Sequence, residues 1–125
     1  MPFDANFNHT YQLNIDGTVA AYRLPYLLSG NSLVLKQSSL YYEHFYSLLN
    51  FNKPHHLDLK EDLSDLEEKL EWIKQNQEEA KEMVKNANEL MDQVLAPINV
   101  YAYWATVLQV IFYFSNCLLD NFSLK

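Results

Sequence analysis

A glycine and an arginine near the start of the chain are the residues whose types and spacing point most directly to binding chemistry. Gly17 follows residues 11–15, which we expect to form a strand, and precedes residues 18–28, which we expect to form a helix. The first N–H groups of a helix have no partner and lie at the positive end of its dipole, so they bind anions, most often phosphate. Thr18 can cap this helix, and the Arg23 guanidinium can reach back about 7.5 Å to the same anion. The pattern predicts a phosphate site; the alternative is an ordinary strand-to-helix turn with a solvated arginine.

Three polar side chains at and after a second expected strand, residues 32–36, would lie at the same edge of the sheet. Ligands of open α/β sheets bind beyond the carboxyl ends of the strands. Lys36 and Gln37 could meet a sugar, a phosphate or the edge of a uracil ring, or could be plain polar residues at a strand end. Glu43 lies near the start of the next expected helix, where its carboxylate could accept both ribose hydroxyls or could be an acid stabilised by the helix dipole.

Several other kinds of chemistry have no matching residue pattern. Neither a G-x-G-x-x-G dinucleotide fingerprint nor a G-x-x-x-x-G-K-[ST] phosphate loop occurs. His55 and His56 are adjacent, so on a strand they point to opposite faces and cannot both bind one metal ion in regular geometry. His44 is typical of a packed histidine and Asp16 of a turn carboxylate, so no nucleophile, base and orienting group come together. We therefore expect no metal, and Cys117, the single cysteine, permits no internal disulfide.

The elements expected to position these residues alternate between strands and helices, which favours an α/β domain with a parallel sheet. In the first strand Tyr11, Leu13 and Ile15 alternate with Gln12 and Asn14, as in a half-buried strand. Pro25 would kink the first helix. The expected elements are strand 11–15, helix 18–28, strand 32–36, helix 40–49, strand 56–59 and helices 63–75, 77–95 and 98–114.

Two of the expected helices have clear apolar faces that predict a core. Ser64 with Glu67 fits a capping box for the helix over 63–75, and either Asp62 or Ser64 could be its cap. The residues expected to be buried on these helices are Leu63, Leu66, Leu70 and Ile73, then Ala80, Met83, Val84, Ala87, Leu90, Met91 and Val94.

The net negative charge of the chain comes from one segment, which includes these helices. Between Asp58 and Asp92 there are twelve acidic and five basic residues, a net −7, which equals the formal charge of the whole chain. A solvated helical face explains this distribution. The absence of a basic patch argues against nucleic acid as a partner.

The C-terminal segment has no charged residue from Ala96 to Leu119. Residues 100–119 are long enough to cross a bilayer, but Gln109, Ser115 and Asn116 and the lack of a flanking Lys/Arg bias weaken that interpretation. We expect residues 1–95 to form one α/β unit and residues 96–125 an apolar helix packed on it, with a membrane-binding or partner-binding tail as the alternative.

About nine tenths of the chain resembles the C-terminal part of the protein O-glucosyltransferases, densely in the first half and loosely after Leu95. The resemblance is strongest to the branch called KDEL motif-containing proteins, among the capsule-associated-protein type of glycosyltransferases. The similarity continues at Leu63-Ser64-Asp65-Leu66 and, more weakly, at Tyr101-Ala102-Tyr103-Trp104. The densest similarity lies in Asn14-Ile15-Asp16-Gly17-Thr18-Val19-Ala20-Ala21-Tyr22-Arg23-Leu24-Pro25, Ser32-Leu33-Val34-Leu35-Lys36-Gln37 and Tyr41-Tyr42-Glu43-His44-Phe45-Tyr46.

The resemblance implies a GT-B glycosyltransferase of two Rossmann-like halves. Such enzymes move glucose or xylose from a UDP-sugar to a serine of EGF-like repeats in the lumen of the endoplasmic reticulum. The implied roles are a donor site in this chain, without cofactor or metal, and a catalytic base and acceptor surface in a missing N-terminal half. The donor-binding residues would be Gly17, Thr18, Val19, Ala20, Ala21, Arg23, Lys36, Gln37 and Glu43.

The chain also departs from the family pattern. Ala102 stands where the family usually has a cysteine, and Lys53 and Asp58 stand where tryptophan and proline are usual. Residues 1–10 do not resemble a signal peptide, and residues 122–125 do not match a lumenal retention signal, so the sequence itself predicts no subcellular location. Two alternatives stay open: a non-catalytic α/β interaction module, and a membrane-attached remnant of such an enzyme.

Overall fold

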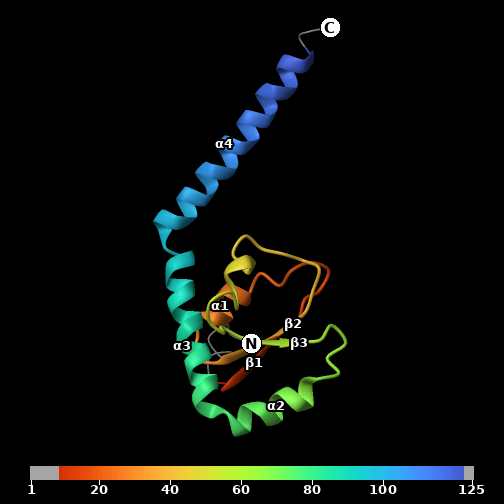
Figure 1. The fold of residues 1–125 in the computed structure, drawn as a ribbon, viewed down its shortest axis with the longest axis vertical. Helices are drawn as coiled ribbons and strands as arrows, with labels where there is room; N and C mark the ends of the chain where they lie inside the picture. Colours follow the sequence, from red (N-terminus) through yellow and green to blue (C-terminus); the bar gives the residue numbers. More distant parts are fainter. Residues whose placement is uncertain (1–8, 123–125) are drawn as a thin grey trace. The chain divides into compact units, whose positions relative to one another are not determined.

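A computed structural model of the chain describes residues 9–122, with side chains as far as residue 116 (Figure 1). The expectations placed on residues 1–8, on the side chain of Cys117 and on residues 123–125 lie outside the described residues. Residues 1–92 and 93–125 form two compact units. The elements are β1 (Tyr11–Asn14), α1 (Leu24–Leu28), β2 (Leu33–Gln37), the 3₁₀ turn η2 (Tyr46–Leu48), β3 (Leu57–Leu59), α2 (Leu66–Gln75), α3 (Gln77–Val94) and α4 (Pro97–Phe122).

The three strands of the first unit form one parallel sheet in the order β1-β2-β3, which confirms the expected α/β class. Asn14 pairs with Lys36, and Lys36 pairs with Asp58. Because side chains of paired residues stand on the same face of a sheet, these three polar residues form a row across its carboxyl end. The alternate positions carry the leucines of the opposite face.

That leucine face carries the main core. Ile73 of α2 and Ala80 and Met83 of α3 pack against it, as the apolar spacing of the two helices predicts. α1 packs on β1 and β2 and buries Leu24, Leu27 and Leu28 outside this cluster. The strand residues of the core cluster are Leu33, Leu35, Leu57 and Leu59.

β1 buries the opposite face from the one its pattern suggests. Tyr11 and Leu13 are 38% and 43% exposed, whereas Gln12 and Asn14 are buried. The Gln12 amide donates to the Ser32 hydroxyl at 3.0 Å, which satisfies one buried group. The alternation correctly predicts a strand, but which face lies inside depends on neighbouring elements, and α2 and α3 pack over β2 and β3 instead of Tyr11 and Leu13.

Two of the expected helices are much shorter in the structure. Residues 18–23 form a loop, and α1 begins at Leu24 with Pro25 in its first turn, where proline is favoured because its missing N–H would have no partner there. Pro25 therefore starts the helix and does not kink it. In place of a helix over 40–49 there is the single turn η2, and the Ser39 hydroxyl accepts the N–H of Tyr41 before it.

The start of α2 also differs from the expected capping box. Asp65 is the N-cap, and its Oδ1 accepts the N–H of Lys60 at 2.9 Å instead of a helical N–H. Asp62 Oδ1 accepts the N–H of Ser64 at 3.1 Å, a local turn that removes Ser64 from the capping role. The helix over 63–75 thus begins at Leu66, while α3 begins at residue 77 as expected.

The second unit consists mainly of α4, whose first twenty residues contain no charged side chain. Within the described residues, neither α3 nor α4 alone is both long and apolar enough to cross a bilayer. Taken together as one bent segment, the two helices meet the requirement by length and composition only.

Candidate functional site

The strand ends meet in a hydrogen-bonded network at the carboxyl edge of the sheet. Gln37 stands at the centre: its Oε1 accepts the N–H of Asp16 at 3.2 Å, and its Nε2 donates to the carbonyl of Glu61 at 2.6 Å. Both ends of the Gln37 amide are therefore occupied. This side chain at the end of β2 joins the loops that follow β1 and β3, so it holds the three strand ends in place.

The loop after β1 is closed by two further bonds. Asp16 Oδ1 accepts the N–H of Ala21 at 2.8 Å, and Arg23 Nη2 donates to the carbonyl of Ile15 at 2.6 Å. Arg23 is thus held beside the end of β1, as its place in the sequence suggests, although from a loop and not from a helix interior. The remaining N–H groups of its guanidinium make no described hydrogen bond.

The segment between these bonds is open. Gly17, Thr18 and Val19 are exposed, and among the described residues no hydrogen bond involves the N–H groups of residues 17–20. A Cβ on Gly17 would meet nothing within 4 Å, and its φ is not positive. The loop therefore offers free backbone donors without a helix dipole, which corrects the expectation of a helix start at Thr18.

Lys36 is a buried cation on the face opposite to Gln37. The residue is 8% exposed, and its Nζ donates to the carbonyl of Gln37 at 3.3 Å. The ammonium lies 4.8 Å from the centre of the Tyr46 ring, a cation–π geometry that offsets part of its lost hydration. The pKa of the Asp58 carboxyl is lowered mainly by its hydrogen bond with His56; burial opposes this effect, and the charge of Lys36 makes a smaller contribution that also lowers the pKa.

Glu43 lies near the same edge, as expected, although it precedes a turn and not a helix. Burial raises the pKa of the Glu43 carboxyl, and the nearby charge of Asp16 raises it further. Burial, followed by the charges of Glu43 and Asp16, raises the pKa of Tyr46 to about 12. These shared electrostatic effects show that Asp16, Glu43 and Tyr46 lie close to one another. No described hydrogen bond or ion pair joins Arg23 to Lys36 or Glu43.

A pocket of about 200 Å³ opens beside Lys36. One wall contains a His–Asp pair: His56 Nε2 and Asp58 Oδ1 are 2.9 Å apart, and this hydrogen bond is the main cause of the lowered Asp58 pKa. The sequence analysis missed this pair, although the i, i+2 spacing on a strand was the available signal. The lining residues are Lys36, Ser38, Ser39, Tyr41, Tyr42, Tyr46, Leu49, Asn50, His56 and Asp58.

The His–Asp pair is not positioned as an accessible base. His56 Nδ1, the atom that would accept a proton, is buried and has no hydrogen-bond partner among the described residues. The other buried polar atoms of this kind are both ends of the Asn14 amide, Asp16 Oδ2 and the Tyr46 hydroxyl. All belong to the carboxyl end of the sheet or to the loops beyond it, where unsatisfied polar groups are concentrated.

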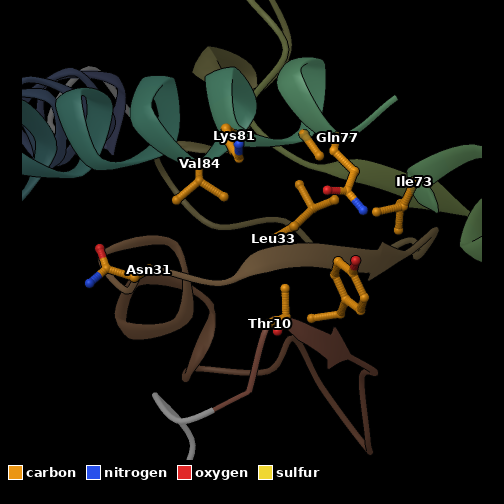
Figure 2. A pocket seen from close by; sticks show the side chains of 9 residues that line it. Thr10, Asn31, Leu33, Ile73, Gln77, Lys81 and Val84 are labelled. Carbon is orange, nitrogen blue, oxygen red and sulfur yellow. The ribbon is translucent and has the colours of Figure 1, made fainter. Parts of the chain in front are cut away.

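A second pocket, of about 190 Å³, lies at the amino end of the sheet between β2 and the junction of α2 and α3 (Figure 2). Leu33, Ile73 and Val84 form much of its wall, and Lys81 is its one charged lining residue. This pocket is far along the strands from the polar edge, so we do not assign the candidate site to it. Among the described residues, no group of three or more His, Cys, Asp or Glu side chains could hold a metal ion.

The fold and the polar carboxyl edge together define an α/β unit with a candidate ligand site at its strand ends. The model of glycosyl transferase family 90 matches residues 1–115, and the chain belongs to this family. It is 51% identical to human protein O-glucosyltransferase 3 over 109 residues, which are 87% of this chain and 21% of that protein. It is 46% identical to zebrafish (Danio rerio) protein O-glucosyltransferase 2, covering 82% of this chain and 20% of the relative.

A more distant relative, rat (Rattus norvegicus) protein O-glucosyltransferase 1, is 31% identical over 80% of this chain and 25% of its own length. The chain therefore spans about a fifth to a quarter of the length of these curated relatives. The match confirms the resemblance drawn from the motifs around Asn14–Arg23.

Proposed function

We propose that this chain supplies the part of a protein O-glucosyltransferase that binds the donor, a UDP-sugar. The observation that carries the proposal is the arrangement of the carboxyl edge: backbone N–H groups of residues 17–20 without a described hydrogen bond, an arginine held at the end of β1 and a buried lysine near the end of β2. Backbone donors, a guanidinium and an ammonium are the groups that bind a diphosphate. The family relationship supports the same assignment.

In this proposal the candidate residues divide the work of binding the donor. The amides of Gly17, Thr18, Val19 and Ala20 contact the diphosphate, and the free edge of the Arg23 guanidinium neutralises charge that develops on the UDP leaving group. Lys36 adds a second cation and Glu43 binds the ribose hydroxyls. Ala21 and Gln37 act indirectly, because the Ala21 N–H and the Gln37 amide hold the two loops in place.

The acceptor side of the reaction belongs to the absent part of the protein. No described side chain combines the accessibility and the partners of a general base, since the His56–Asp58 pair hides its free nitrogen. We propose that an N-terminal half completes a two-domain GT-B cleft and binds the EGF-like acceptor, and that the whole protein acts in the endoplasmic reticulum lumen. The choice between glucose and xylose depends on contacts outside these residues.

A titration of the ¹⁵N-labelled chain with UDP tests the donor site. We expect the amides of residues 17–22 to shift first, followed by those around Lys36 and Glu43. Uridine, which lacks phosphates, should shift the Glu43 region and leave Gly17 unchanged. Shifts confined to the acidic helices α2 and α3 would contradict the proposal.

A further inference from the structure

Asn50 is the centre of a compact set of hydrogen bonds beside the candidate site. It is a non-glycine residue in the left-handed region, with φ at 54°, a conformation that asparagine tolerates better than most residues. Its Nδ2 donates to Asp58 Oδ2 at 3.2 Å, which ties the loop to the end of β3. The short segment 50–58 therefore depends on this residue for its closure.

Asn50 and His55 hold each other reciprocally. The N–H of Asn50 donates to His55 Nδ1 at 3.0 Å, and Asn50 Oδ1 accepts the N–H of His55 at 2.8 Å. We call this reciprocal pair the latch. His55 is 7% exposed, so water does not readily replace its partner.

The latch exists only while His55 is neutral. Nδ1 accepts the Asn50 N–H through its lone pair, which places the ring proton on Nε2. A proton added to Nδ1 would turn this atom into a donor that faces another donor. The closed geometry then loses one hydrogen bond and sets the Asn50 N–H against a second donor.

The surroundings of His55 disfavour its charged form. Burial lowers the pKa of His55, and the nearby His56 and Lys53 lower it further. On the other side, Asp58 bonds to His56, not to His55, at 2.9 Å. From α3, Glu89 is 3.7 Å from Lys53 and also 3.8 Å from Lys85. No described ion pair joins His55 itself to a carboxylate.

Residues 38–49 form most of the pocket beside Lys36, together with Asn50, the first residue of the turn that follows. The latch closes that turn, residues 50–55. α3 supports its far end, because Asn86 Nδ2 donates to the carbonyl of Pro54 at 3.2 Å. Opening the latch would therefore change the wall of the pocket while leaving the sheet intact.

We propose that the Asn50–His55 pair is a pH-sensitive latch, which opens the turn 50–55 beside the pocket when His55 takes up a proton. The effect on loop closure stands independently of the ligand. Its consequence for binding rests on the proposed donor site, and the measurements below separate the two.

The direct test is the protection of the Asn50 amide against hydrogen exchange between about pH 7.5 and 5.5, corrected for the intrinsic exchange rate. Below the ordinary histidine range, protection should fall by up to about tenfold per pH unit until the folded pKa of His55 is reached. The fall should begin near the ordinary histidine pKa and end at the pKa of the folded His55 ring, which NMR measures in the same samples. Constant protection between these two pH values would overturn the proposal.

A variant and a matched control locate the effect. His55→Asn places an amide oxygen that cannot be protonated near the Nδ1 position, so its protection profile should be flat. His9→Asn, at an exposed histidine outside the loop, should keep the wild-type profile. If His55→Asn keeps the wild-type slope, another group controls the loop, and the latch is wrong. If His55→Asn fails to fold, the wild-type titration alone decides.

UDP affinity measured over the same pH range tests the consequence of the latch for ligand binding. It should weaken on acidification in the wild type and in His9→Asn, and to a lesser degree in His55→Asn. If UDP does not bind at any pH, the donor-site proposal fails while the exchange result still decides the latch. Tighter closure on acidification would assign control to His56, because its protonation would strengthen its contact with Asp58.

Discussion

Arg23 combines two tasks that one substitution can separate. Its Nη2 donates to the Ile15 carbonyl, while no described hydrogen bond uses its remaining N–H groups, which we propose bind the phosphate. Arg23→Lys keeps the charge but loses the planar fork, so we expect UDP affinity to fall about tenfold or more. Calorimetry with UDP and with uridine measures the difference. Uridine binding should change little, and equal losses for both ligands would show that Arg23 acts through the fold.

Gly17 provides a sharper test of where the phosphate lies. A methyl group there meets no atom within 4 Å, and the backbone is not left-handed. Gly17→Ala should therefore leave the free energy of unfolding unchanged or raise it by up to about 1 kcal/mol. If phosphate oxygens approach this backbone, UDP should bind roughly fivefold more weakly. Unchanged affinity would move the diphosphate elsewhere.

His55 also predicts how global stability depends on pH. Its pKa is lowered in the folded state, so below the unfolded value of about 6.5 the unfolded chain binds more protons than the folded one. The stability that neutral His55 provides is complete above that pH and is lost as the pH falls through the folded pKa. Urea unfolding at about pH 7.5 and 5.5 should show a larger loss in the wild type than in His55→Asn. An equal loss in both would assign the pH dependence to other groups.

At the scale of elements, the turn before α2 is the clearest determinant of local structure. Asp65 is buried at the N-cap and accepts the Lys60 N–H, so it joins the end of β3 to the helix. Asp65→Ala should cost about 1–2 kcal/mol of unfolding free energy in a urea titration. The exposed Asp62→Ala, three residues earlier, is the matched control and should have a smaller effect. The reverse order would mean that the Ser64 turn sets the start of α2.

The elements differ in how well the sequence predicts them, for physical reasons. Periodic apolar spacing correctly identifies the strands and the long helices α2 and α3, because the core selects those faces. Residues 18–23 and most of residues 40–49 lack the expected helix, and side chains there bind backbone N–H groups: Asp16 accepts that of Ala21, and Ser39 accepts that of Tyr41. Such contacts join residues at spacings that the local hydrophobic periodicity of the sequence does not reveal.

The candidate site is likewise predicted only in part by the sequence. Gly17, Arg23, Lys36 and Glu43 come to one edge because parallel strands end together, which the order of elements already predicts. The His56–Asp58 pair and the role of Asn50 come from side-chain geometry, which the residue order alone does not determine.

At the scale of the whole molecule, we expect the chain alone to transfer no sugar, even where it binds UDP. A positioned general base contributes about 10²–10⁴-fold in rate, and acceptor positioning adds to that. The chain should be incubated with UDP-glucose and a folded EGF-like repeat, and the repeat then weighed by mass spectrometry. At most, slow hydrolysis of UDP-glucose is expected. A hexose added well above the no-protein rate would show that the chain is a complete enzyme.

The unusual burial of β1 has a practical consequence for this molecule. Among the described residues β1 is an edge strand, and it presents Tyr11 and Leu13 to solvent while its polar side chains point inward. An edge with free backbone groups and apolar side chains can pair with another such edge. Self-association at high protein concentration would cover these residues and compete with correct refolding. Solution measurements on the isolated chain therefore belong at low concentration, with its mass in solution checked at each step.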